Sequence, residues 1–490
     1  MPNIRQFLET RVSAAIAAAW PDAADAPAIV QAAADGRFGD YQANGAMALA
    51  KRLKTNPHEV AQRVVEQLNE DAEVAAMAET PEIAGPGFIN FTLRPEWVAE
   101  RLGEVNHVDT DGEDRLGVEP AAEPETVVVD YSAPNLAKEM HVGHLRSTII
   151  GDALVRMLDF AGHNVVRQNH VGDWGTQVGM LIEYLFSRVA SESTAEFASY
   201  VNLLLSDLEE FYRQAKTAFD TSQRFAAAAR QAVVRLQSGE ADALERWQGW
   251  RNASLAHSFS VYKRLGVLLT TDDIRGESAY NDVLSDIVDA LQAKGLLTES
   301  EGARCVFLQD ADGKPLFANK EGEPLPLIVQ KADEGYLYAT TDLAAIAFRT
   351  GCLPEIPNPK SQIRNENSPK ASRILYVVDA RQSLHFQMVF ECAYQAGFAE
   401  PGRHALVHVA FGTMMGEDGR PFKTREGGTV KLMDLLDEAE RRARKLVEEK
   451  QADLPDDQPH LSEEEKDRIA RKVGIGGVKY ADLSQNRTSD

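Results

Sequence analysis

The chain has 490 residues, enough for two to four domains and at least one large hydrophobic core. With 44% apolar and 26% charged residues it has the composition of a soluble globular protein, and no run approaches the roughly 18 apolar residues of a membrane span. Its net charge of −23 argues against indiscriminate nucleic-acid binding, which needs phosphate neutralisation, but allows a specific RNA partner at a local basic face. Three widely spaced cysteines, Cys305, Cys352 and Cys392, predict neither a disulfide framework nor a metal centre, so we expect a reduced, cytoplasmic protein.

Residues 1–108 predict a separate, small α+β domain. Apolar residues at helical spacing indicate a helix that Pro21 ends and a later helix that Pro57 begins. Alternating apolar and polar residues between 83 and 93 predict a strand. Residues 109–125 are acidic, contain two prolines and are typical of a linker.

Three aromatic residues of this first domain, Phe38, Tyr41 and Phe88, are candidates for RNA contact. Aromatic rings stack on exposed bases in proteins that bind single-stranded nucleic acids. The alternative is that the three rings belong to the core of the domain, which is the commoner role of aromatic side chains. The sequence leaves both interpretations open.

The region 126–430 predicts an α/β domain, Rossmann-like and built on a parallel sheet. A β-branched run at 127–129 indicates a buried strand, and a polar loop leads from it to a helix that begins near Val142. A second strand within 164–170, followed by a Gly-rich loop, implies a right-handed βαβ unit. A helix that starts after such a strand attracts phosphate, because its first N–H groups are unpaired.

The rest of the chain predicts two insertions and a helical end. Helical spacing over about 180–265 indicates a helical insertion, after which 268–271 is expected to resume the sheet. Turn residues between short apolar runs indicate a hairpin insertion at about 300–335. Residues 431–490 predict a helical junction. Further buried strands are expected at 374–378 and 406–410.

The loop after the first strand carries the most informative motif, His141-Val142-Gly143-His144. Two imidazoles flank a glycine, whose missing side chain allows a ligand or another backbone to come close. Taken alone, the motif is equally consistent with two polar histidines at a surface turn. Its setting between a buried strand and a helix start favours a nucleotide site.

These motifs resemble those of bacterial arginyl-tRNA synthetases of class I, and the resemblance covers essentially the whole chain. Its most specific segments are 131–138, 141–148 and 172–175. The resemblance implies that the carboxylate of L-arginine attacks the α-phosphorus of ATP, expels pyrophosphate and passes the arginyl group to the 3′ end of tRNA(Arg). It implies Mg²⁺ with the ATP, and we expect a monomer without a membrane partner. The first domain resembles the one that reads the tRNA elbow.

The resemblance also implies roles for single residues around the ATP. His141 and His144 would hydrogen-bond developing charge on the phosphates, and Gly143 would leave room for the adenosine. Such charge stabilisation, with little covalent participation, is what this chemistry requires. Further ATP contacts are implied for His385 and Gly412.

Recognition of arginine demands carboxylates, because a guanidinium presents a rigid fork of donors. The implied arginine-binding residues are Asp130, Asn135, Tyr338, Asp342 and Gln382. Asp342 is expected to be the principal guanidinium partner, with Tyr338 one helical turn away packing on it. Asp342 is expected to open a helix, so the alternative for this residue is a role as the helix N-cap, where Asp is favoured.

Two departures from the family pattern concern the end of the chain. The signature loop lacks its first lysine, which is Pro421 here, so Lys423 and Arg425 are left as catalytic cations and Lys138 is expected to stand in for the missing one. The alternative is that these are solvated charges at a Gly-rich hairpin. The family also continues into an all-helical anticodon-binding domain, which we expect this chain to lack.

Two rival functions stay open: the departures allow the first, and the recurrence of His-x-Gly-His in other class I-like nucleotidyltransferases allows the second. One is a truncated or divergent relative that binds arginine or tRNA without efficient aminoacylation. The other is a different nucleotidyltransferase with the same His-x-Gly-His motif, which would not need Asp342 and Tyr338.

Overall fold

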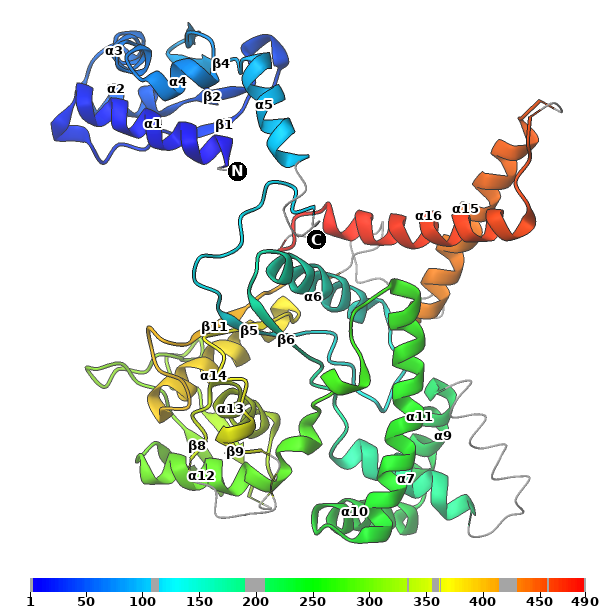
Figure 1. Ribbon diagram of the computed structural model, residues 1–490. Coiled ribbons are helices and arrows are strands. Elements are labelled where there is room, and N and C mark those ends of the chain that lie inside the picture. Colours follow the sequence, from blue (N-terminus) through cyan, green and yellow to red (C-terminus); the bar gives the residue numbers. More distant parts are fainter. Residues whose placement is uncertain are drawn as a thin grey trace. The chain divides into compact units, whose positions relative to one another are not determined.

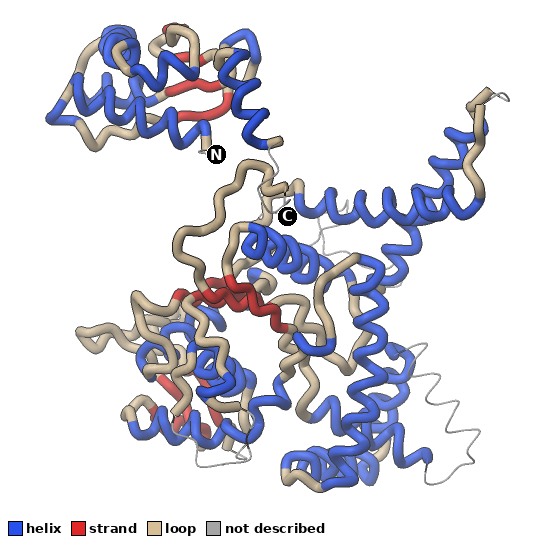
Figure 2. Tube along the Cα trace, in the orientation of Figure 1, coloured by secondary structure: helices blue, strands red, loops and turns tan. Residues whose placement is uncertain are grey.

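The computed structural model describes residues 3–106, 114–189, 208–332, 335–354, 361, 363–413, 430–455 and 458–488. They form two compact units, Met1–Ala121 and Ala122–Asp490 (Figures 1 and 2). The division lies inside 109–125, the segment predicted as a linker. Within the described part of the chain, no helix has the length and apolar character needed to cross a bilayer.

The first unit is a four-stranded antiparallel sheet packed against helices. Its strand order is β1-β2-β4-β3. Pro57 occupies the first turn of α3 and the Asn56 side chain caps that helix, so the predicted start is confirmed. The elements of the unit are α1 (Ile4–Ala19), β1 (Val30–Ala32), β2 (Tyr41–Ala43), α2 (Gly45–Leu53), α3 (Pro57–Asn69), α4 (Ala72–Met77), β3 (Glu82–Ala84), β4 (Phe88–Phe91) and α5 (Pro95–Val105).

The second unit is built on a four-stranded parallel sheet in the order β11-β10-β5-β6. All three strand pairs run parallel, which confirms the predicted α/β fold class. Val127, Val128 and Val129 of β5 are fully buried, as expected for a strand covered on both faces. The strands are β5 (Thr126–Asp130), β6 (Asn164–Gln168), β10 (Arg373–Tyr376) and β11 (Ala405–His408).

Helix α6 (Val142–Phe160) connects β5 to its parallel neighbour β6. The helix passes close to the end of β5: a Cβ atom on Gly151 would lie 2.2 Å from the Cβ of Tyr131. Only glycine allows this approach. Leu145 and Ile149 of α6 join the core cluster that also contains Val127 and Val129, so burial fixes the helix on the sheet.

The described residues of the segment for which a helical insertion was predicted contain four helices. They are α7 (Thr176–Val189), α9 (Leu208–Thr221), α10 (Gln223–Gln237) and α11 (Ala241–Leu265). They pack around Trp250 and Phe211, both fully buried. The C-terminal end of α11 returns to the sheet beside α6, where Tyr262 and Leu265 enter the same core as Leu145 (Figure 1).

The remaining elements are α12 (Leu284–Ala293), β7 (Leu297–Ser300), β8 (Ala303–Val306), β9 (Leu327–Gln330), α13 (Tyr338–Thr350), α14 (Ser383–Ala396), α15 (Leu432–Ala452) and α16 (Glu463–Leu483). The strands β7, β8 and β9 form a separate antiparallel sheet. Helix α16 begins with a capping box between Ser462 and Glu465.

Two predicted elements are wrong. Residues 268–271 do not resume the parallel sheet: a 3-10 turn covers Thr271–Asp273, closed by the Asp273 carboxylate on Thr270, and only Ile274 bridges to Asn169. The apolar residues at 267–269 suggested a strand, but they gave no sign that the Asp273 side chain would accept from the Thr270 amide and turn the chain. Helix α13 begins at Tyr338 rather than at Asp342, because Leu337 is its N-cap.

Candidate active site

The candidate site lies at the carboxyl edge of the parallel sheet, where ligands bind in open α/β folds. Asp130 ends β5, and the chain after β10 leads there into a 3-10 helix, Ala380–Gln382, and then into α14. The loop between Tyr376 and α14 bridges, at Asp379, to Phe411 after β11. The motif at His141 is joined to the chain beyond β11 by a bridge to Lys431 and by a hydrogen bond from the Val142 amide to the Val430 carbonyl (3.1 Å).

His141 and His144 cap the helix that they begin. His141 is the N-cap of α6, and its Nδ1 accepts a hydrogen bond from the Gly143 amide (3.0 Å). His144 Nδ1 accepts one from the His141 amide (3.1 Å). The two side chains thus satisfy helix-start donors as a capping box does. Because each Nδ1 accepts, the proton of each neutral ring is on Nε2.

The charge state of the two imidazoles follows from their surroundings. Burial, with the charge of Lys138 and then Arg381, lowers the pKa of His141. Burial lowers the pKa of His144 to about 3, helped by the neighbouring His141. Their ring centroids are 4.0 Å apart. Near neutral pH the pair therefore offers two neutral Nε2–H donors to a ligand.

Gly143 has a role that the sequence did not suggest. A Cβ atom there would lie 2.7 Å from Cε1 of the His141 ring. The glycine therefore lets the capping ring fold over the first turn of α6. Whether it also admits an adenosine stays a prediction.

On the other side of the site, α13 presents Tyr338 and Asp342 one turn apart. The His385 Nε2 atom, near the start of α14, lies 2.7 Å from Asp342 Oδ2, and the Tyr338 and His385 rings meet edge to face. Asp342 lies in the second turn of its helix, so the N-cap alternative is wrong. The predicted ATP residue His385 is thus joined directly to a predicted arginine residue.

Glu277 is a site residue that the sequence did not reveal. It begins a 3-10 helix, Glu277–Val283, and burial with the charges of Asp173 and Asp342 raises its pKa to about 8. Among the described residues its carboxylate has no ion-pair partner. Two carboxylates, from Glu277 and Asp342, thus influence each other beside the sheet edge, which is an arrangement that a cationic ligand would stabilise.

Asp130 has a partner of its own. Its Oδ2 atom accepts a hydrogen bond from Nη2 of Arg349 (2.7 Å), and Arg349 Nε donates to Gln168 (2.6 Å). Both charged side chains are buried. The Oδ1 atom of Asp130 is buried and has no hydrogen-bond partner among the described residues. The Oδ2 atom of Asp130 therefore joins α13 to β5, and the Oδ1 atom can accept a hydrogen bond from another donor.

The other predicted contacts lie in loops. Asn135 is exposed, and its Oδ1 accepts from the Ala137 amide (2.9 Å). Gln382 is exposed just before α14. The Gly412 carbonyl accepts from Nη1 of buried Arg146, which also pairs with Asp482 (2.8 Å). Lys423 and Arg425 lie outside the described residues.

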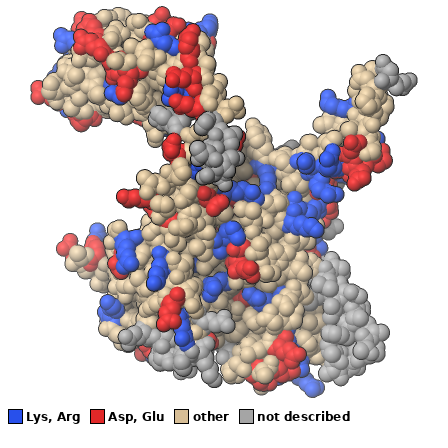
Figure 3. Space-filling view, viewed as in Figure 1, with Lys and Arg blue, Asp and Glu red and all other residues tan. Residues whose placement is uncertain are grey.

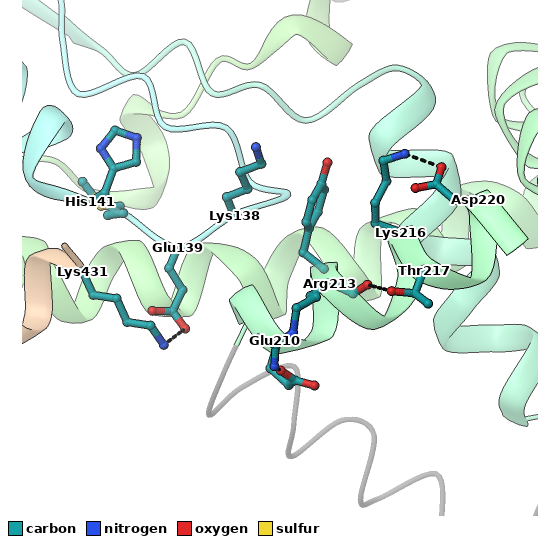
Figure 4. Close-up of a pocket in the computed structure, with 11 residues that line it drawn as sticks. Lys138, Glu139, His141, Glu210, Arg213, Lys216, Thr217, Asp220 and Lys431 are labelled. Atoms are coloured by element: carbon teal, nitrogen blue, oxygen red, sulfur yellow. Dashed lines mark hydrogen bonds and ion pairs between the residues drawn. The ribbon is translucent and has the colours of Figure 1, made fainter. Parts of the chain in front are cut away.

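A cavity of about 630 Å³ adjoins His141 (Figure 4). Lys138 lies in it, with its ammonium 4.9 Å from the centre of the Tyr212 ring. Lys431 and Glu139 pair across the same wall (3.3 Å). Most charges here are compensated by neighbours, whereas Lys138 has no carboxylate partner among the residues described.

The three candidate RNA-contacting aromatics differ in exposure. Phe38 is 46% exposed at the end of a 3-10 turn. Tyr41 is half-buried and packs against the core of its unit. Phe88 is half-buried at the start of β4. Core packing thus accounts for Tyr41 better than for Phe38.

Fold and site together define a nucleotide-using enzyme of the class I synthetase type. Residues 112–490 match the family of class I tRNA synthetase catalytic domains for arginine, and residues 6–93 match the arginyl-tRNA synthetase N-terminal domain. The arginine–tRNA ligase of Laribacter hongkongensis is 52% identical over 100% of this chain and 77% of its own length. That of Azotobacter vinelandii is 54% identical over 95% and 72%.

Solved structures agree. The arginyl-tRNA synthetase of Plasmodium falciparum superposes with a TM-score of 0.72 at 26% identity, covering 100% of this chain and 76% of that one. The Thermus thermophilus enzyme shares the fold, with a TM-score of 0.70 at 23% identity over 99% and 76%. The chain belongs to the arginyl-tRNA synthetase family.

Proposed function

We propose that this chain is an arginine–tRNA ligase that works through the residues described above. The carboxylate oxygen of arginine bonds to the α-phosphorus of ATP and pyrophosphate leaves. A terminal hydroxyl of the tRNA then takes the arginyl group and AMP leaves. The observation that carries the proposal is that the carboxyl edge of one sheet carries both two neutral imidazole donors, His141 and His144, and two carboxylates, Glu277 and Asp342.

We assign the binding of the ATP phosphates to His141 and His144. Their Nε2–H groups are donors held in place by the helix cap, so they need no rearrangement when negative charge develops. Lys138 adds a positive charge on the same loop. Lys423 and Arg425 are proposed as further cations, and Gly412 and His385 as ATP neighbours. Mg²⁺ is proposed to arrive with the ATP.

The guanidinium is assigned to Asp342 and Glu277. A guanidinium carries five donors in a rigid fork, and two carboxylates can accept several of them. Tyr338, 68% exposed beside Asp342, is free to pack on the flat cation. The positive charge of the bound guanidinium would also offset the repulsion from Asp173 and Asp342, which together with burial raises the pKa of Glu277.

The remaining arginine contacts are proposed for Asp130, Asn135 and Gln382. Asp130 has one buried oxygen without a partner among the described residues, but its other oxygen already holds Arg349. We therefore assign it a hydrogen bond or a supporting role rather than the main charge contact. Asn135 and Gln382 are assigned to the α-amino and carboxylate groups.

Binding of tRNA(Arg) is proposed for basic and aromatic surfaces. Figure 3 shows Lys and Arg side chains over α15 and α16, next to a group of Asp and Glu side chains. On α15, Arg441, Arg442 and Lys445 are exposed, and each is paired with a glutamate of the same helix. Phe38 is the best-exposed candidate for base stacking in the first unit, ahead of Tyr41 and Phe88. A monomeric state and a cytoplasmic location are further parts of the proposal.

The test is ATP–pyrophosphate exchange by the intact chain, measured with arginine, with and without added tRNA(Arg). Arginine-dependent exchange and subsequent charging of tRNA are expected. The absence of exchange under both conditions, together with arginine-induced thermal stabilisation, would favour the divergent relative that binds without efficient aminoacylation.

A further inference from the structure

The loop that leaves β5 begins with an unfavourable backbone. Ser132 and Ala133 have φ angles of +72° and +44°, although neither is glycine. Side chains with a Cβ atom rarely adopt this left-handed region, and two such residues in succession persist only when surrounding contacts enforce them. The same loop leads on to Asn135, Lys138 and His141, so its first turn sets where these side chains lie.

The contacts that enforce this turn include a tyrosine from the helical insertion. Tyr262, near the end of α11, is 1% exposed. Its hydroxyl accepts a hydrogen bond from Asn169 Nδ2 (2.9 Å) and lies 2.8 Å from Ser132 Oγ, to which its own proton can go. Asn169 Oδ1 in turn accepts from the Ala133 amide (3.0 Å). Tyr262 thus fixes both residues of the turn.

The network continues from the turn into α6. The Ser132 amide donates to Ser147 Oγ (2.9 Å), and Ser147 donates to the Val377 carbonyl after β10 (2.6 Å). The Ser132 and Thr148 hydroxyls are 2.9 Å apart, and Thr148 donates to the His144 carbonyl (2.7 Å). Ser132, Thr148 and Asn169 are each at most 3% exposed. Water therefore does not replace a lost partner readily.

We propose that Tyr262 is a positioning residue for arginine activation, holding through its hydroxyl the left-handed Ser132–Ala133 turn that places Asn135, Lys138 and His141. The role rests on the proposed function, because it matters for activity only if this loop binds substrate. It assigns to α11 a part in the site through Tyr262, which acts on the loop rather than on the substrate. Loss of the hydroxyl leaves Asn169 Nδ2 without its acceptor and lets the turn relax.

The first experiment compares Tyr262→Phe with Tyr184→Phe in arginine-dependent ATP–pyrophosphate exchange. Tyr184 is a matched control: it is also buried in the insertion, but its hydroxyl donates to Gln214 on α9 rather than to the Ser132–Ala133 turn or to Asn169. We expect Tyr262→Phe to lower kcat/KM for arginine about tenfold or more, as for loss of a buried hydrogen-bonded hydroxyl, and Tyr184→Phe to change it less than about twofold. Equal effects would overturn the proposal.

A second variant separates positioning from general destabilisation. Ala133→Gly keeps the amide that bonds Asn169 but removes the Cβ atom that disfavours a positive φ. In the Tyr262→Phe chain it is expected to restore at least about a third of the lost activity, since the turn then needs less support. A failure of this rescue at unchanged melting temperature would contradict positioning through the turn.

Hydrogen exchange of the peptide 131–141 gives a readout that does not need activity. The amides of Ser132 and Ala133 are bonded within the network, so they are expected to exchange faster in Tyr262→Phe and unchanged in Tyr184→Phe. If Tyr262→Phe does not fold, Ser132→Ala removes the same bond from the other side. Unaltered exchange rates would refute the proposal, whereas inactivity of the unmodified chain would refute the proposed function alone.

Discussion

The two halves of the candidate site are built by different means. The phosphate half consists of His141 and His144, three residues apart, and is fixed by hydrogen bonds within one helix start. The arginine half combines Glu277, Asp342 and His385 from three separate segments and is fixed by the packing of the whole second unit. The first half offers neutral donors and the second offers negative charge. Each is matched to a different part of the proposed substrates.

The largest effect is expected from Asp342→Asn, which removes a charge from the arginine half and keeps its size. Truncating one partner of a buried charge pair costs 2–5 kcal/mol, so kcat/KM for arginine should fall on the order of 10³-fold. The KM for ATP should change less than that for arginine, because His141 and His144 are intact and only His385, the proposed ATP neighbour bonded to Asp342, is affected. Steady-state ATP–pyrophosphate exchange measures both. Undiminished activity would instead favour a different nucleotidyltransferase with the same histidine motif.

A replacement in the phosphate half should give the opposite pattern. His144→Ala removes an Nε2–H donor, and loss of one such donor typically costs about 10²–10³ in kcat. Arginine affinity, read from arginine-induced thermal stabilisation, should stay near that of the unmodified chain.

The control for that experiment is His144→Asn, whose side-chain oxygen can still accept from the His141 amide and so keep the helix cap. If the alanine variant loses activity only because α6 frays, the asparagine variant should recover most of it. Equal losses in both variants would point to the lost donor.

The third prediction concerns the pH dependence of arginine binding. Burial and the charges of Asp173 and Asp342 raise the pKa of Glu277 to about 8, and a bound guanidinium favours its ionised form. Arginine should therefore bind more tightly as the pH rises towards about 8 and level off above it. Glu277→Gln should flatten this dependence and weaken binding at pH 8.5 about tenfold. His385→Asn is the control, because the imidazole of His385 is another ionisable group beside Asp342. The pH dependence of arginine binding should persist in this variant if Glu277 is its source.

Glu277 should also affect stability without arginine. Its pKa in the folded chain, about 8, lies above the ordinary value of 4.5, so between these values the folded state binds the extra proton. The contribution of this group to stability is therefore lost as the pH rises through that window. Glu277→Gln should accordingly raise the melting temperature at pH 8. An unchanged melting temperature together with an unchanged pH profile would contradict the assignment.

The same contrast explains what the sequence could and could not predict. The phosphate half was predictable, because a buried strand, a loop and a helix start are local patterns and both histidines lie in the loop. The start of α3 at Pro57 was predictable for the same reason. Asp342 and Tyr338 were found through family resemblance, and their shared helix was misread by four residues because Leu337 gives no side-chain cap signal.

Other features could not be read from sequence because they join distant segments. Glu277 stands in no periodic or motif-like pattern, and its environment arises when Ser278 binds Asp173, 105 residues earlier. The pairing of Asp130 with Arg349 spans 219 residues. The network around Tyr262 spans 130 residues, and its left-handed turn contains no glycine that would have signalled it.

The smallest effect is expected outside both halves, at Phe38 in the first unit. Stacking of one base on one partly exposed aromatic ring is worth about 1 kcal/mol, the lower end of its range, so Phe38→Ala should raise the KM for tRNA(Arg) about fivefold. Tyr41→Phe is the matched control, because the Tyr41 ring packs against its own core and the change keeps that ring. The KM values for arginine and ATP should be unaffected, since the substitution touches neither half of the site. A rise confined to the KM for arginine would contradict a tRNA contact of Phe38. A rise confined to the KM for tRNA would add a third region, in the first unit, to the two halves of the site.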